Sequence, residues 1–183
     1  MKDLITIISH NEFVSLRKIT NREKGIHGYY YLHEDRCNGK IVAILPYRFK
    51  NGKIQYLLRN EYTPCWNTKE KVISSITGGV DTGVSIIDTC INELLEEAGY
   101  LANENDFIYL GKMKGTKSCD TNYYLYTIDL TDNNSLDAMG DGSELEKQSY
   151  CFWGDIIDDS LDPFIYALYY RLNKYLKEKS NYE

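Results

Sequence analysis

The segment from Ser85 to Gly99 constrains the fold of this chain more than any other. Its apolar residues fall at 87, 90, 91, 94 and 98, the spacing of one face of an α-helix. Ser85 stands where a side chain caps the first helical turn, and Gly99 stands where a left-handed residue ends a helix. A glycine-rich stretch, 78–83, leads into the segment. The pattern predicts one sharply bounded amphipathic helix entered through a turn.

Short segments rich in β-branched and aromatic residues lie on both sides of this helix. Asn51-Gly52 is a hairpin signal, and Pro163 suits the first turn of a last helix with apolar residues on one side. We therefore expect an α+β fold, layered α/β/α, in which helices sandwich a mixed β-sheet. The predicted strands are 13–19, 29–33, 40–47, 54–59, 72–76, 107–110, 123–130 and 149–153.

The 183 residues suffice for one ordinary domain, and they contain no repeat or low-complexity tract. We expect an N-terminal β segment over 1–35 and the main domain over 36–183. The apolar stretch 4–8 is too short for the core of a signal peptide. No run of 18 apolar residues occurs, so no membrane span is expected.

Charge and cysteine content narrow the classes of partner. The net charge of -6 disfavours binding of nucleic acid, because such binding requires neutralisation of phosphates. The five cysteines form no CxxC pair, a pattern typical of reduced thiols. We therefore expect a cytoplasmic protein with a small-molecule substrate.

Three carboxylates crowd the end of the predicted helix. Glu93 and Glu97 are four residues apart and share a face, and Glu96 lies beside them. The three side chains repel one another, and the helix dipole disfavours negative charge at this end. A divalent cation such as Mg²⁺ or Mn²⁺ removes both penalties. A solvated acidic face is the alternative interpretation.

The glycine turn, the helix and the carboxylates together resemble the Nudix box, G-x5-E-x7-R-E-U-x-E-E-x-G-U, in which U is a bulky apolar residue. The resemblance identifies the chain as a member of the Nudix hydrolases. Gly83 also matches a glycine that many members place before the first box Glu. The matching residues of the box are Gly78, Glu93, Leu94, Glu96, Glu97, Gly99 and, more loosely, Tyr100.

Two positions depart from the box. Val84 replaces its first glutamate, and Asn92 replaces its arginine. In the family this arginine orients the ligand glutamates, and the first glutamate lies near it. Losing both charges together avoids one unpaired charge, because breaking only one partner of a buried pair costs most. One interpretation is therefore a coupled loss with activity retained, which we favour since the three glutamates remain. The other is a decayed site.

The flanking segments resemble the ADP-ribose and ADP-sugar pyrophosphatase branch. The segment 55–62 is similar to a strand of that branch that ends in a substrate-facing arginine, here Arg59. Trp66 lies in a polar segment between strands, where it would stack on a base or pack partly buried. The acidic loop that supplies a general base in the branch corresponds here to Glu144 or Glu146, with Glu144 preferred. The Ser-Pro-Gly pattern that the branch carries after the box is missing, however.

The resemblance implies metal-assisted hydrolysis of a pyrophosphate bond in a nucleoside diphosphate linked to X. Glu93 and Glu97 would be catalytic and bind Mg²⁺ or Mn²⁺, and Glu96 would share a second ion. The carbonyl of Thr77 would be a further ligand. Gly78 and Gly79 would bind substrate together with Arg59 and Trp66.

Several alternatives stay open at this point. ADP-ribose or an ADP-sugar is favoured, while dinucleoside polyphosphates, NADH and capped RNA remain as other substrates. A non-catalytic nucleotide-binding domain is the second hypothesis, supported by Val84 and Asn92. A protein-interaction module is the third, and the carboxylate cluster argues against it. A homodimer is also expected, because the first 35 residues are extra to the family core and such a segment helps dimerisation in the resembling branch. Residues 29–31 would lie at its interface.

Overall fold

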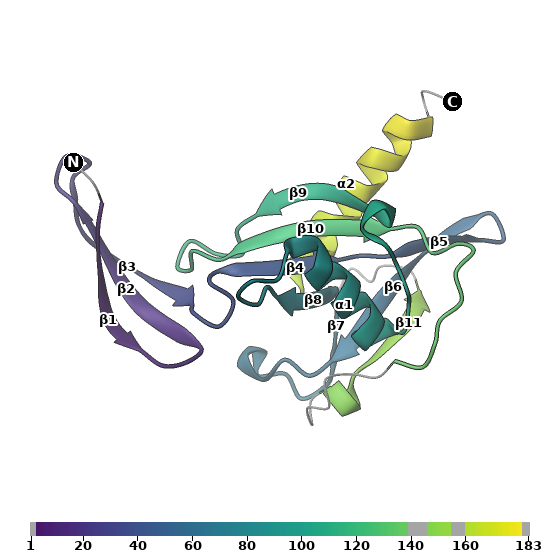
Figure 1. Cartoon of the computed structure of the whole chain (residues 1–183), viewed down its shortest axis with the longest axis horizontal. Coiled ribbons are helices and arrows are strands. Elements are labelled where there is room, and N and C mark those ends of the chain that lie inside the picture. The colour runs from purple at the N-terminus through teal and green to yellow at the C-terminus, as the bar shows by residue number, and fades with distance from the viewer. Residues whose placement is uncertain (1–2, 139–145, 155–159, 181–183) are drawn as a thin grey trace.

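The computed structural model describes residues 3–138, 146–154 and 160–180. Within them the chain forms two sheets that lie between two helices, and a third sheet projects from this body as an arm (Figure 1). The fold is α+β, and the predicted layering is confirmed, but three separate sheets replace the single mixed sheet that the sequence suggested.

The arm is an antiparallel sheet of three strands in the order β1-β2-β3. The strands are β1 (Leu4–His10), β2 (Val14–Asn21) and β3 (Ile26–Glu34). Every residue of β1 is exposed, although four of its seven residues are leucine or isoleucine. The sheet joins the body where the Leu32 amide donates to the Ser118 carbonyl and the Asp120 amide donates to the Leu32 carbonyl.

The first sheet of the body is mixed. Its order is β8-β4-β10-β9, and only the pair of β4 with β10 is parallel. Its strands are β4 (Lys40–Ile44), β8 (Ile76–Gly79), β9 (Phe107–Met113) and β10 (Asn122–Ile128).

The second sheet of the body is antiparallel, in the order β11-β6-β5, with β7 also paired to β6. Asn51 and Gly52 both adopt left-handed backbone conformations at the turn between β5 and β6, which confirms the predicted hairpin. The strands are β5 (Tyr47–Lys50), β6 (Lys53–Glu61), β7 (Val72–Ser74) and β11 (Tyr150–Gly154).

Two strands predicted as continuous are divided. The segment 40–47 breaks at Leu45 and Pro46, and the chain passes there from the first body sheet to the second. Proline has no amide hydrogen to continue a strand ladder, so the break falls where the sequence permits it. The segment 72–76 divides in the same way at Ser75, between β7 and β8.

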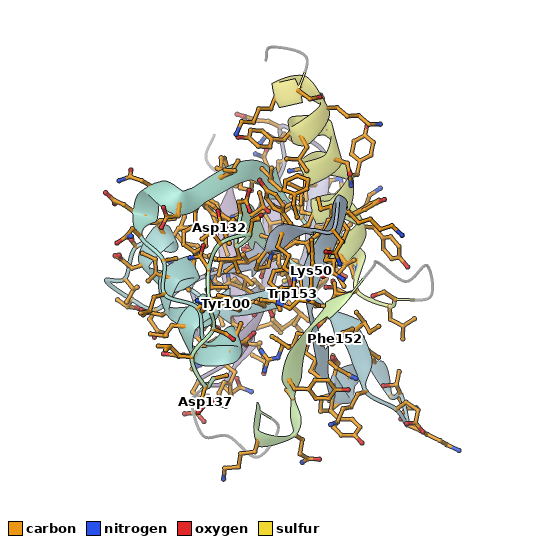
Figure 2. The ribbon with its side chains drawn as sticks, turned by 90° about the vertical axis from the view of Figure 1, so that its right-hand side faces the viewer. Lys50, Tyr100, Asp132, Asp137, Phe152 and Trp153 are labelled. Carbon is orange, nitrogen blue, oxygen red and sulfur yellow. The ribbon has the colours of Figure 1, made fainter. Side chains whose placement is uncertain are left out.

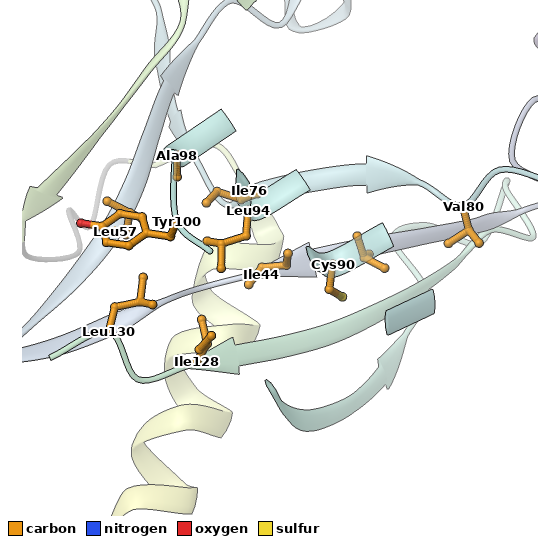
Figure 3. Close-up of a cluster of buried hydrophobic side chains, with 11 residues drawn as sticks. Ile44, Leu57, Ile76, Val80, Cys90, Leu94, Ala98, Tyr100, Ile128 and Leu130 are labelled. Atoms are coloured by element: carbon orange, nitrogen blue, oxygen red, sulfur yellow. The ribbon is translucent and has the colours of Figure 1, made fainter. Parts of the chain in front are cut away.

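Each face of the body is covered by one helix. Helix α1 (Ile86–Ala98) packs Cys90 and Leu94 into a core that includes Ile44, Leu57 and Ile76 (Figure 3). Helix α2 (Pro163–Ser180) packs on the opposite side and buries three apolar residues, Ile165, Leu168 and Leu172. Three short 3-10 helices complete the described elements: η1 (Pro64–Trp66), η2 (Glu104–Asp106) and η3 (Glu146–Gln148).

The start of α2 is tied to the link between β7 and β8. Buried Asp162 accepts hydrogen bonds from the Ser75 amide at 2.8 Å and from the Ser75 hydroxyl at 2.7 Å. Its other oxygen caps α2 by accepting from the Phe164 amide at 2.7 Å. In the described part of the chain, neither helix is both long and apolar enough to cross a membrane.

Candidate active site

Helix α1 has the boundaries that its sequence predicts. The Ser85 hydroxyl accepts a hydrogen bond from the Asp88 amide at 3.1 Å, and Gly99 ends the helix with φ of 73°. The Gly99 carbonyl in turn accepts from the Leu136 amide at 2.8 Å. Both ends of the helix that carries the glutamates are therefore fixed by local contacts.

Gly78 of β8 lies directly against the side chain of Glu93. A β-carbon placed on Gly78 would lie 1.8 Å from Glu93 Oε1 and 2.1 Å from its Cδ. A side chain at this position would therefore displace the Glu93 carboxylate from its place beside β8.

Arg59 of β6 lies between two carboxylates. Its guanidinium forms an ion pair with Glu97 Oε1 of α1, and its Nε lies 3.3 Å from Glu61 Oε2. Arg59 is 7% exposed, and the Glu97 side chain is 5% exposed. The three groups form a buried row that links β6 to the last turn of α1.

The other oxygen of Glu97 has no hydrogen-bond partner. Glu97 Oε2 is buried, and nothing in the described structure donates to it. By contrast, Glu61 Oε1 accepts from the Ser74 hydroxyl at 2.6 Å. Burying an unpaired carboxylate oxygen is costly, so Oε2 is an open ligand position in an otherwise paired row.

Cys151 of β11 is opposite Arg59 in the strand ladder. Burial raises the pKa of its thiol to about 11, with the Arg59 guanidinium acting in the opposite direction. The thiol is therefore neutral at physiological pH, and it serves as packing beside the ion-pair row.

The remaining predicted site residues lie on α1 and β8. Glu96 is half-buried on α1, and Thr77 is paired with Ala43 in the ladder of β8 and β4. Gly79 follows in β8, where a β-carbon would lie 3.2 Å from Cys37 Cβ. Among the residues with described positions, no three His, Cys, Asp or Glu side chains gather closely enough to hold a metal ion.

The candidate donor atoms are nevertheless oxygens, the type of ligand that a divalent cation such as Mg²⁺ binds. Mg²⁺ takes oxygen ligands and is commonly held by one or two carboxylates, with substrate phosphates and water completing its shell. Glu97 Oε2 is such a donor, buried and without a partner. Glu93, Glu96 and Thr77 stay predicted as further ligands.

The two positions that depart from the box both face outward. Val84 is 37% exposed, and Asn92 is exposed on α1. Neither the missing glutamate nor the missing arginine leaves a buried gap there.

Other predicted residues lie farther from this row or beyond what the structure describes. Trp66 ends η1 and is 36% exposed. Glu146 begins η3, and Glu144 lies outside the described residues. Their predicted roles in base stacking and proton transfer stay predictions.

Sequence reasoning missed the partners that hold the site. Glu61 lies two residues from Arg59 in the same strand, so the alternation of a β-strand was the signal that the two share a face.

A second cluster lies beside the end of α1, where Trp153 Nε1 donates to the Tyr100 hydroxyl at 3.2 Å and the Arg48 guanidinium lies over the Trp153 ring. Figure 2 labels Tyr100 and Trp153 in this region.

Comparison with known proteins finds likeness among solved structures. No protein-family model matches the chain, and no curated protein matches it either. A solved structure described as the "Crystal structure of ADP compounds hydrolase" matches with a TM-score of 0.72 and 16% sequence identity. The match covers 98% of this chain and 96% of that one. At this identity the likeness supports the fold alone, and it agrees with the predicted α+β architecture.

Proposed function

We propose that this protein hydrolyses the pyrophosphate bond of a nucleoside diphosphate linked to X, with ADP-ribose or an ADP-sugar as the favoured substrate. The observation that carries the proposal is Glu97, a buried carboxylate with one oxygen paired and one open, at the position of the last box glutamate. The structural likeness to a protein described as an ADP compounds hydrolase supports the same choice of substrate class.

The residues of the site have separate roles in this proposal. Glu97 and Glu93 would hold Mg²⁺ or Mn²⁺, with Glu96 and the Thr77 carbonyl as further ligands. The cation would supply charge stabilisation at the phosphate oxygens and make a bound water more acidic. Gly78 lets the Glu93 side chain approach β8. Gly79, the next residue of β8, also has no side chain to cover the backbone there.

Proton transfer and substrate orientation need further groups. A carboxylate takes a proton from water when it lies within hydrogen-bond reach. We assign this role to Glu144 or Glu146, with Glu144 preferred, on the family resemblance alone. Trp66 would stack on the base of the nucleotide, and its partial exposure leaves its ring accessible.

The experiment is a hydrolysis panel of ADP-ribose, ADP-glucose, NADH, a dinucleoside tetraphosphate and nucleoside triphosphates, each with Mg²⁺, Mn²⁺ or EDTA. We expect metal-dependent cleavage of ADP-ribose to AMP and ribose 5-phosphate. Glu97→Gln should lower the rate at least about 100-fold, since metal chemistry at the phosphate carries several kcal/mol of the barrier. Glu104→Gln, an exposed carboxylate of η2, is the matched control and should leave the rate unchanged.

A second candidate function is nucleotide binding without turnover, which the neutral, exposed Val84 and Asn92 favour. Calorimetric titration with ADP-ribose in the presence of Mg²⁺ distinguishes it. Binding by a folded protein that releases no product from any member of the panel would replace the hydrolase proposal with this one.

We also propose that the arm mediates a homodimer. Leu4 and Ile5 point to opposite faces of β1 and are 65% and 51% exposed, so both faces present apolar surface. In a two-fold symmetric dimer, the apolar surface of each arm would be covered by the same surface of the second copy.

Light scattering after size exclusion should give a dimer for the wild type and a monomer for Ile5→Lys/Ile7→Lys. Tyr170→Lys, an exposed α2 position, should stay dimeric; a monomeric wild type at micromolar concentration would contradict the proposal.

A further inference from the structure

Helix α1 carries its negative charges without any cation of its own. Three glutamates occupy its last two turns, and its last turn contains no basic residue. The dipole of the helix makes this end unfavourable for carboxylates. At the box position where the family places arginine, this chain has exposed Asn92. A positive charge must therefore come from elsewhere in the fold.

Arg59 supplies that charge from β6. It lies in the interior of the second body sheet, opposite Ser74 on β7 and opposite Cys151 on β11. Its planar guanidinium contacts Glu61 on one side and Glu97 on the other. Arginine suits this place because its fork of donors binds two carboxylates in fixed geometry, which a lysine cannot do equally well.

The row of charges fixes one conformation of Glu97. Oε1 is held by Arg59, and Oε2 is left buried and without a donor. Arg59 is in turn held by Glu61, which is itself held by the Ser74 hydroxyl. Each link limits the freedom of the next, so the direction of Oε2 is set by residues of β6 and β7.

We propose that Arg59 is a positioning residue for Glu97 and takes over the orienting task that the family gives to the box arginine. This inference rests on the proposed function, because the task matters only if Glu97 binds a cation. It also differs from the substrate contact that the resemblance predicts for Arg59. The guanidinium has two carboxylate partners and 7% exposure, a geometry better suited to acting through Glu97.

The test compares Mn²⁺ binding and kinetics in wild type, Arg59→Gln, Arg59→Lys and the control Arg48→Lys. Arg48 lies on β5, where its partners are Gln55 and the Trp153 ring, neither of which is a carboxylate of the row. Mn²⁺ binding is followed by electron paramagnetic resonance without nucleotide. Thermal unfolding reports whether each variant is folded, and Arg59→Lys carries the test if Arg59→Gln is not.

We expect Arg59→Gln to weaken Mn²⁺ binding about 10-fold or more, the usual effect of removing a residue that orients a metal ligand. Arg59→Lys should recover part of the loss, and KM for ADP-ribose at saturating metal should stay within about threefold of wild type, since substrate contacts are unchanged. In a Glu97→Gln background, Arg59→Gln should cause no further loss, because the two residues act as a unit.

Three results would overturn the inference while leaving the hydrolase intact. Unchanged Mn²⁺ binding with a raised KM would assign Arg59 to the substrate. Tighter Mn²⁺ binding would make Arg59 a competitor of the metal. Unchanged binding and kinetics would leave Arg59 a structural residue. A folded wild type that neither binds Mn²⁺ nor cleaves any nucleotide would instead reject the proposed function together with the inference.

Discussion

The two sides of helix α1 are constrained to very different degrees. On the inner side, Glu97 is 5% exposed and paired with Arg59, while Glu93 lies against Gly78 without room for one added carbon. On the outer side, Asn92 is exposed, and Val84 just before the helix is 37% exposed. The motif is intact where the helix is buried and altered where it is exposed.

This difference teaches which parts of the motif the fold needs. A buried carboxylate depends on its partners, because removing one of them leaves an uncompensated charge in the interior. An exposed position can exchange a charged pair for valine and asparagine at little cost, since water solvates either choice. Substitutions on the buried side of α1 should therefore cost more than substitutions on its exposed side.

The largest effect on stability is expected at Arg59. Arg59→Met leaves the buried Glu97 and the half-buried Glu61 without their cation, which costs about 3 kcal/mol. For a chain of this size, the melting temperature should fall by roughly 6–12 °C. Differential scanning calorimetry measures it, with Arg48→Met as the matched control because the partners of Arg48, Gln55 and the Trp153 ring, are neutral. A fall no larger than that of the control would mean that the row contributes little.

Gly78→Ala should have the next largest effect. The added methyl group overlaps the Glu93 carboxylate, so the side chain must move or the helix must shift, at a cost of about 1–3 kcal/mol. Cleavage of ADP-ribose should fall at least about 10-fold, since Glu93 is displaced from its place beside β8.

The control for this change is Gly52→Ala in the hairpin turn, where a β-carbon meets nothing within 4 Å. That variant carries backbone strain from its left-handed conformation, but it should retain wild-type kinetics. Equal rates for Gly78→Ala and wild type would show that the position of Glu93 is unimportant for catalysis.

The smallest effect is expected when the box charges are restored on the outer side. Val84→Glu/Asn92→Arg should change the free energy of unfolding by no more than about 0.5 kcal/mol, the usual range for exposed substitutions. Steady-state rates should stay within about threefold of wild type, because neither position touches the ion-pair row. An increase of 100-fold in turnover would identify the natural chain as a decayed enzyme and contradict the coupled-loss interpretation.

Local signals in the sequence predicted the elements that local interactions determine. Ser85 and Gly99 marked both ends of α1, and Asn51-Gly52 marked the β-hairpin, since caps and turns depend on neighbouring residues. The first strand, β1, was not predicted because its apolar residues show no alternation between a buried and an exposed face. The division of one expected sheet into three depends on contacts between distant segments.

For the candidate site, too, the sequence predicted the residues of one element but not their partners in other elements. Spacing placed Glu93, Glu96 and Glu97 on one helix, and the structure adds that Glu97 is the one held by an ion pair. That pair joins residues 59 and 97 across two elements, and no spacing rule connects them. Sequence patterns find the residues of one element, whereas their partners across elements follow from the packed fold.

The most direct test of the account is an anomalous difference map from crystals grown with Mn²⁺ and a non-hydrolysable ADP-ribose analogue. We predict a peak at about 2.2 Å from Glu97 Oε2, an ordinary distance for an oxygen ligand, with Arg59 still on Oε1. A metal ion bound elsewhere, with Glu97 Oε2 making no contact to it, would contradict the central claim that the buried, Arg59-paired glutamate is the metal ligand of a hydrolase.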